Sequence, residues 1–271
     1  MKQCKIYLIL ILLTVGCATR DNTEFQQFSE QVTLLSEETS LVLQSVVTLS
    51  ELNRSEAIAE QNPELLEATI LQRTGSYSLT GDTTVMHFAL LNLISTSTSS
   101  TDALLYYALL LEELTNQSDF TVATSDLLNP YLGNFAPVIS VLVYQGKIEK
   151  STTETQAMMH LADSTVSNVS NNIAVSLQVT ANSVQAIYAL MSARRQREII
   201  TEGYPIELVD ELLQLNSASV EILSRLELLN RAWKILPGIH RELASSLSEK
   251  STSATLKILG TMLLDLREEQ E

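Results

Sequence analysis

Apolar residues recur along the first part of the chain at alternating intervals of three and four positions, with Glu, Gln and Ser in most of the positions between them. This spacing places the apolar side chains on one face of an α-helix, as in a coiled coil. The stripe consists of Phe25, Phe28, Val32, Leu35, Thr39, Val42, Val46 and Leu49. We therefore predict a long helix over about residues 25–60.

Two further stripes of the same kind predict long helices over about 152–200 and 205–236. Gly203-Tyr204-Pro205 is expected to end one helix and begin the next, and Pro237-Gly238 to end the later one. The first of these stripes contains Met159, Ala162, Val166, Val169, Ile173, Leu177, Thr180, Val184, Ile187 and Met191. The second contains Leu208, Leu212, Leu215, Ser219, Ile222, Leu226, Leu229, Trp233 and Leu236.

The middle of the chain, residues 83–146, is its most apolar part. Three apolar runs occur at 85–94, 103–111 and 135–144, and the Ser/Thr-rich segment 95–101 is interpreted as a linker between the first two. Each run is shorter than the ~20 residues that a bilayer-spanning helix needs.

Shorter helices are expected from Asn62-Pro63-Glu64 to about residue 73 and over about 253–267, with a turn at 75–82. The 271 residues include only 8 Gly and 5 Pro, which favours helices over a sandwich or a barrel. The sequence therefore predicts an all-α fold for residues 25–271. We expect one domain, an elongated antiparallel bundle of long, heptad-striped helices.

The chain begins with two lysines, an apolar run over 6–13 and the small-residue sequence Val15-Gly16 before Cys17. A positive start, a short apolar stretch and small residues before a cleavage site make a secretory signal. The Gly16-Cys17 junction resembles the lipobox of bacterial lipoproteins. This resemblance covers only residues 1–17.

The resemblance implies that residues 1–16 are removed and that Cys17 becomes the lipidated N-terminus, carrying diacylglycerol on its thiol and an acyl chain such as palmitate on its amine. Residues 17–24 would then be a tether. Ala18 follows the cysteine, where an Asp would favour the inner membrane. We therefore expect an anchor in the outer membrane, on its periplasmic side, with the inner membrane as the alternative.

The chain is acidic, with 32 Asp and Glu against 17 Lys and Arg and a net charge of −15. Such a surface repels nucleic acid and anionic lipid, so neither is an expected partner. The remaining candidates are the membrane, through the anchor, and a protein partner or a second copy, through the helical stripes.

Candidate chemistry is sparse. His160 and Asp163 are three residues apart on one helical face, within reach of each other. Such a pair can be half of a metal site, an acid–base pair or a local structural pair. A metal site needs three or four ligands, and no further His lies nearby in sequence. The acidic pairs at 112–113 and 210–211 are typical of solvated helix faces. There is no nucleophile elbow or dinucleotide motif, and Gln145-Gly146-Lys147 lacks the rest of a phosphate loop. We expect no catalytic residue, no metal and no cofactor.

Arg194, Arg195 and Arg197 form the tightest basic cluster, in the last turns of the helix predicted over 152–200. Cations at this end complement the helix dipole. They are also the weak candidates for contact with a lipid phosphate or an acidic partner.

These features favour a membrane-anchored binding or scaffolding component of the cell envelope. The alternative is a membrane-active protein, a pore-former or lipid handler, that uses the apolar region 85–111 as a hairpin folded at 95–101. An enzyme with a dispersed site is the third hypothesis.

Overall fold

The computed structural model describes residues 23–59, 83–115, 152–246 and 254–268, and these residues form five α-helices. The helices are α2 (Thr23–Ala59), α4 (Thr83–Thr115), α7 (Thr152–Thr201), α8 (Ile206–Ser246) and α9 (Ala254–Glu268). The all-α prediction is confirmed, and the helices predicted over 25–60 and 152–200 agree with α2 and α7. The expected helix over 62–73, the turn at 75–82 and the apolar run 135–144 lie outside the described residues.

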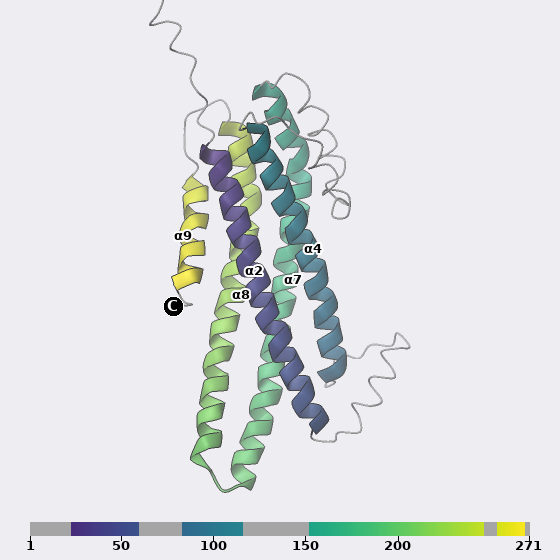
Figure 1. Cartoon of the computed structure of the whole chain (residues 1–271), viewed down its shortest axis with the longest axis vertical. Coiled ribbons are helices and arrows are strands. Elements are labelled where there is room, and N and C mark those ends of the chain that lie inside the picture. The colour runs from purple at the N-terminus through teal and green to yellow at the C-terminus, as the bar shows by residue number, and fades with distance from the viewer. Residues whose placement is uncertain (1–22, 60–82, 116–151, 247–253, 269–271) are drawn as a thin grey trace, which may run out of the picture.

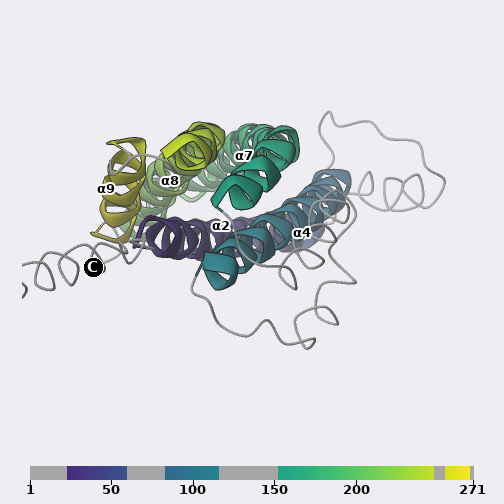
Figure 2. The same ribbon diagram turned by 90° about the horizontal axis from the view of Figure 1, so that it is seen from above.

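The four long helices form an elongated bundle of two layers (Figure 1). Helices α2 and α4 make one layer and α7 and α8 make the other, as the view along the bundle shows (Figure 2). Consecutive long helices run antiparallel, and each packs on its neighbours around the bundle. The short helix α9 covers one edge, where it contacts both α2 and α8.

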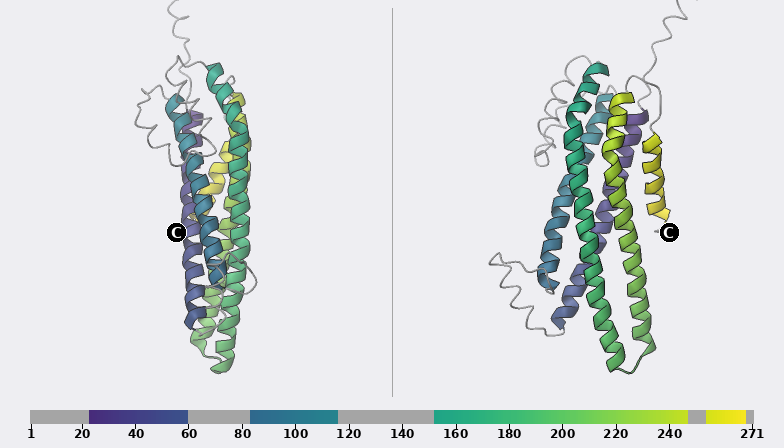
Figure 3. Two further views of the ribbon diagram at one scale, coloured as in Figure 1. Left: turned by 90° about the vertical axis from the view of Figure 1, so that its right-hand side faces the viewer. Right: turned by 180° about the vertical axis from the view of Figure 1, so that it is seen from behind.

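The predicted stripes form most of the core. Every residue of the α2 stripe and of the α7 stripe is at most 8% exposed. The α8 stripe divides into two parts: Leu226, Leu229, Trp233 and Leu236 are buried, whereas its members from Leu208 to Ile222 are only half-buried. The reason is visible in Figure 3, in which α7 and α8 extend past the ends of α2 and α4.

The prediction of a linker at 95–101 is wrong, because α4 continues through it as one helix. Each hydroxyl from Thr96 to Thr101 donates a hydrogen bond to the carbonyl four residues earlier, so the hydroxyls are satisfied within the helix. Ser97 and Thr101 also continue the buried face that Leu90 begins and Leu104 extends. The region 85–111 is thus part of one continuous helix in this structure and not a hairpin folded at 95–101.

The predicted helix end at Pro237-Gly238 is also wrong, since α8 runs through both residues to Ser246. A proline inside a helix removes one backbone hydrogen bond and costs ~3 kcal/mol. This segment recovers that cost by packing, because Trp233, Leu236, Ile239 and His240 around it are all fully buried. Burial of large apolar side chains contributes ~1.5–3 kcal/mol each.

The turn predicted at Gly203-Tyr204-Pro205 is confirmed. Gly203 has φ +78°, and the amide of Tyr204 donates to the carbonyl of Ile199 at 2.8 Å, the bond of a Schellman helix end. Tyr204 also has a positive φ, 64°, which a bulky side chain rarely adopts. The two residues reverse the chain within four positions and allow α7 and α8 to pack along their length.

Candidate binding surface

The pair His160–Asp163 is only the outer part of a larger polar cluster. His160 is half-exposed, and its Nδ1 lies 3.4 Å from Oδ2 of Asp163. The other carboxylate oxygen, Oδ1, lies 2.6 Å from Nδ1 of His240 on α8. On the far side of that ring, Nε2 lies 2.6 Å from the hydroxyl of Tyr107 on α4. The structure thus brings Asp163, His240 and Tyr107 into one line.

The hydrogen bonds fix how His240 carries its proton. A carboxylate only accepts, so Nδ1–H of His240 donates to Asp163, and Nε2 accepts from the Tyr107 hydroxyl. Burial lowers the pKa of His240, although Asp163 opposes the shift by its hydrogen bond and its charge. Burial also raises the pKa of the Tyr107 hydroxyl well above its usual value, with a further contribution from Asp163.

This relay resembles a catalytic triad in connectivity but not in access. Tyr107 and His240 are both 0% exposed, and the tilted ring of Phe28 lies 6.3 Å from that of His240. A substrate therefore cannot reach either reactive atom. The relay instead ties α4, α7 and α8 together in the packed part of the bundle, where unpaired polar atoms would be costly.

A second polar cluster occupies the end of α2, where α7 and α8 begin to extend beyond it. The Arg194 guanidinium donates to the side chain and the backbone carbonyl of Asn53, at 2.8 and 3.2 Å. Arg195 lies within 3.4 Å of carboxylate oxygens of Glu56, Glu198 and Glu211, which come from α2, α7 and α8.

These contacts bury Arg194 and hold the half-buried Arg195 against acidic side chains of three helices. Arg194 is only 8% exposed and Arg195 is half-buried, whereas Arg197 is exposed. The arginines that might have met an external phosphate thus bind acidic and amide groups of this chain. Contact with an external acidic group stays a prediction, and Arg197 is its most accessible member.

A shallow groove of about 300 Å³ lies between α2, α7 and α8 at this end. It is lined by Leu52, Glu56, Met191, Arg195, Glu211, Gln214, Leu215 and Ala218. Farther toward the other end, α9 covers the seam between α2 and α8.

The end of the bundle formed by residues 198–224, here called the distal hairpin, exposes large apolar side chains. Tyr204 is 70% exposed and Ile206 is 73% exposed, and Ile200 beside them is 64% exposed. Leu213 and Val220 on α8 are also largely exposed. A group of exposed apolar side chains on a protein surface is typical of an interaction site.

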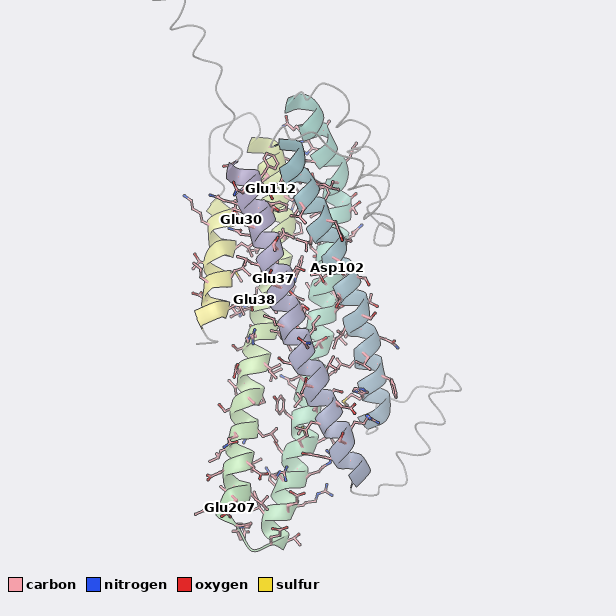
Figure 4. The ribbon with its side chains drawn as sticks, viewed as in Figure 1. Glu30, Glu37, Glu38, Asp102, Glu112 and Glu207 are labelled. Carbon is pink, nitrogen blue, oxygen red and sulfur yellow. The ribbon has the colours of Figure 1, made fainter. Side chains whose placement is uncertain are left out.

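The distal hairpin is also strongly acidic. It contains six acidic residues and no Lys or Arg. Glu207, at its tip, lies at the opposite end of the bundle from Glu30 and Glu112 (Figure 4). On α8, Glu207 directly follows the exposed Ile206, and Glu221 directly follows the exposed Val220. Consecutive side chains of an α-helix point about 100° apart, so each acid points away from the apolar residue before it. The exposed Asp210, in contrast, lies three residues before Leu213, on the same face of α8.

Of the two other histidines, His87 is also buried. Its Nδ1 lies 3.0 Å from the Ser50 hydroxyl and its Nε2 3.3 Å from Glu51, so it joins α4 to α2. The pKa of His87 is lowered from its ordinary value, mainly by desolvation, and the charge of Glu51 opposes this shift only in part. Within the described residues, no group of three His, Cys, Asp or Glu side chains could hold a metal ion.

Among the described helices, the segment Met159–Thr201 of α7 is long and apolar enough by length and composition to cross a membrane. A core helix passes the same test, and the stripe of α7 is buried against its neighbours. Its low polarity reflects a run without any charged residue, from Ser164 to Ala193.

One functional feature could not be predicted from the sequence, and a second one could have been. His240 lies 77 residues from Asp163 in the chain, and no local motif joins them. Ile206, Leu213 and Val220 are exposed and recur at intervals of seven residues. The sequence thus contains a second apolar stripe on α8, beside the predicted stripe from Leu208 to Leu236. Cys17, the predicted lipidation site, lies outside the described residues.

Comparison with protein families, with curated proteins and with solved structures gives no match. The function proposed below therefore rests on this chain's own residues.

Proposed function

We propose that this protein is a lipid-anchored binding or scaffolding component of the bacterial cell envelope, held at one end and offering the distal hairpin to a protein partner. The exposure of Ile200, Tyr204 and Ile206 at the end of the bundle carries the proposal. The anchor would be diacylglycerol and acyl chains such as palmitate on Cys17, after removal of residues 1–16.

The position of α2 supports this orientation. Helix α2 begins at Thr23, six residues after Cys17. Six residues span at most ~20 Å, so the lipid would be close to the end of the bundle where α2 begins. The distal hairpin is at the other end (Figure 1). With α7 50 residues long, the tip would be about 75 Å from the anchored end.

The location we propose is the periplasmic side of the outer membrane. Two or three acyl chains anchor a protein far more firmly than one, at ~0.8 kcal/mol per buried methylene. The net charge of −15 supports an orientation in which the bundle extends away from anionic lipid rather than lying on it. Catalysis is not part of the proposal.

Fatty-acid labelling tests the anchor. The full chain and its Cys17→Ser variant are expressed in a Gram-negative host with radioactive palmitate, and inner and outer membranes are then separated. We expect label on the unchanged chain alone, in the outer membrane. A matched Cys4→Ser variant should keep the label, because Cys4 lies in the segment that is removed. Unlabelled protein free in the periplasm would overturn the proposal.

The membrane-active alternative uses the apolar region 85–111, which belongs to α4. It requires α4 to leave a bundle in which Leu104, Tyr107 and Leu111 are buried. Release of a dye from vesicles by the purified chain would favour this alternative over the scaffold.

A further inference from the structure

The side of the α7–α8 layer that faces away from α2 and α4 has almost no charge. No Asp, Glu, Lys or Arg occurs between Ser164 and Ala193 of α7. The exposed side chains there are amides, alanine and valine, and Val175 is 61% exposed. In a chain with a net charge of −15, an uncharged surface of this length is unusual and demands a physical reason.

The apolar residues of distal α8 continue this surface. Leu213 and Val220 lie roughly 100–160° around α8 from Gln214 and Ala218, which line the groove that faces α2. An exposed hydrogen bond of 3.5 Å from Ser192 of α7 to Asn216 of α8 joins the two helices on this side. We call the combined surface the neutral face. Its exposed residues are Asn168, Asn172, Val175, Val179, Asn182, Gln185 and Ala189 of α7 with Leu213, Asn216 and Val220 of α8.

We propose that the neutral face binds a second copy of this chain. Two copies with a net charge of −15 each repel one another wherever carboxylates meet. Across the neutral face they can approach without bringing like charges together. The face is also self-complementary in chemistry, because amides pair with amides and apolar side chains with apolar side chains, as a two-fold interface requires.

The spacing of the exposed residues fits helix-to-helix packing. Asn168, Val175, Asn182 and Ala189 follow one another at intervals of seven, and Leu213 and Val220 do the same. Such a repeat keeps one seam facing a partner helix, and asparagines within it fix the register between copies.

The size of the neutral face suits a stable dimer. From residue 168 to residue 193 it is roughly 40 Å long, and two adjacent helices make it about 20 Å wide. Its area is thus on the order of 800 Å², which is what each partner of a standard interface contributes. On α8 the exposed Asp210 limits the face toward the tip, and the exposed pair Glu227 and Arg231 limits it toward the other end.

On α7 this surface lies on the side of the bundle, away from Tyr204 and Ile206 at the tip. On α8 it shares Leu213, Asn216 and Val220 with the distal hairpin, which the proposed function assigns to another protein. Pairing of two copies does not depend on the lipid. If two copies are anchored in one membrane, their bundles lie parallel. Each residue near the two-fold axis then faces its own counterpart, so one cysteine per chain is enough to link them.

Cysteine cross-linking tests the pairing. Val175→Cys, Val179→Cys and Leu213→Cys are introduced one at a time into the full chain, and envelopes are treated with a short bis-maleimide. The control is Leu264→Cys on α9, which lies outside the neutral face and matches Val175 in exposure. Leu264 is 62% exposed and Val175 is 61% exposed. We expect covalent homodimers from at least one α7 position and none above background from the control. Equal yields at all positions, or adducts only with other proteins, would overturn the proposal.

Charge insertion gives an independent measurement. Sedimentation of the detergent-purified full chain should show a dimer, and Val175→Glu with Val179→Glu should weaken it at least tenfold. The matched pair Val175→Gln with Val179→Gln adds polarity without charge and should remain dimeric. Repeating both in a Cys17→Ser background separates this proposal from the anchor, because loss of lipid should leave the dimer intact. A monomer at every concentration, with native circular dichroism, is the result that contradicts pairing.

Discussion

The two halves of α8 carry the same stripe of residues and lie in different surroundings. Leu229, in the half near α9, is fully buried between helices, and Leu215, two heptads earlier, is half-buried beside a groove. The difference does not come from α8 itself. It comes from α2, whose last turn lies beside Arg195 of α7, so that the end of α7 and the start of α8 extend beyond it as two helices.

This comparison teaches that a heptad stripe specifies which face of a helix is apolar, not what covers it. In the packed half the cover is α2, α4 and α9, and the buried His240 and Tyr107 are hydrogen-bonded to each other. In the distal half, α7 and the end of α2 are the described helices that lie beside α8. Several of its apolar side chains are therefore exposed. The packed half buries most of the apolar surface, and the distal half leaves apolar side chains exposed.

The largest expected effect separates the two halves directly. Leu229→Ala should cost 2–5 kcal/mol of unfolding free energy, because it leaves a cavity among fully buried side chains. The matched change Leu215→Ala should cost about 1 kcal/mol, since water and neighbouring side chains can fill the space it leaves. Urea denaturation followed by circular dichroism measures both. Equal costs would mean that the distal half is as well packed as the other.

Removal of the Tyr107 hydroxyl should have the next largest effect. Tyr107→Phe leaves Nε2 of the buried His240 without its donor, so we expect a loss of about 1–3 kcal/mol. Tyr204→Phe in the distal hairpin removes the same atom from a side chain that is 70% exposed, and should change stability by less than about 0.5 kcal/mol. A Tyr107→Phe protein as stable as the unchanged one would contradict the role assigned to the relay.

Two glycine substitutions should shift stability in opposite directions. Gly203→Ala places a side chain at φ +78° and should cost roughly 1–2 kcal/mol. Gly238→Ala lies inside α8, where an added Cβ meets nothing within 4 Å, and should gain roughly 0.5–1 kcal/mol. Thermal unfolding of the pair is sufficient to check this. A destabilised Gly238→Ala variant would mean that the proline-containing segment of α8 needs its glycine.

Acidification should weaken the packed half through His240. Its pKa is lowered in the folded state, mainly by burial, from the ordinary value of 6.5. The unfolded chain therefore binds the proton first as the pH falls below about 6.5, and stability is lost from there down to the folded pKa. His87 is shifted in the same direction. Urea midpoints at about pH 7.5 and pH 5.5 should differ less for His240→Gln than for the unchanged chain. An unaltered difference would exclude His240 as the group responsible.

Much of the fold could be predicted from residue spacing, because alternation by three and four is a local property. It located α2 and α7 and their buried faces. The two errors, at 95–101 and at 237–238, arose from judging residues by their local propensity. Hydroxyls of Thr96 to Thr101 bond back to their own helix, and packing around Pro237 outweighs its cost. The stripe of α4 does run through Ser97 and Thr101, which was the signal that would have corrected the first error.

The sites were less accessible to prediction. The relay needs Tyr107, Asp163 and His240 from three helices, and only the packing of the bundle brings them together. The arginine cluster was found as a motif, but the burial of Arg194 against Asn53 depends on where α2 ends. Exposure of the distal hairpin likewise follows from the relative lengths of helices, which a stripe alone does not encode.

Photo-cross-linking in living cells tests the central claim most directly, that the distal end of an anchored bundle contacts a partner. A benzophenone amino acid replaces Tyr204, which is 70% exposed at the tip, or Leu161, which is 65% exposed near the start of α7 at the opposite end. The account predicts a discrete adduct with a different protein from position 204 and none with a different protein from position 161. Position 161 lies seven residues before Asn168 of the neutral face, so an adduct there with a second copy of the chain agrees with the account. Adducts with a different protein from position 161 alone, or none from position 204 in cells where the chain is folded and lipidated, would contradict it.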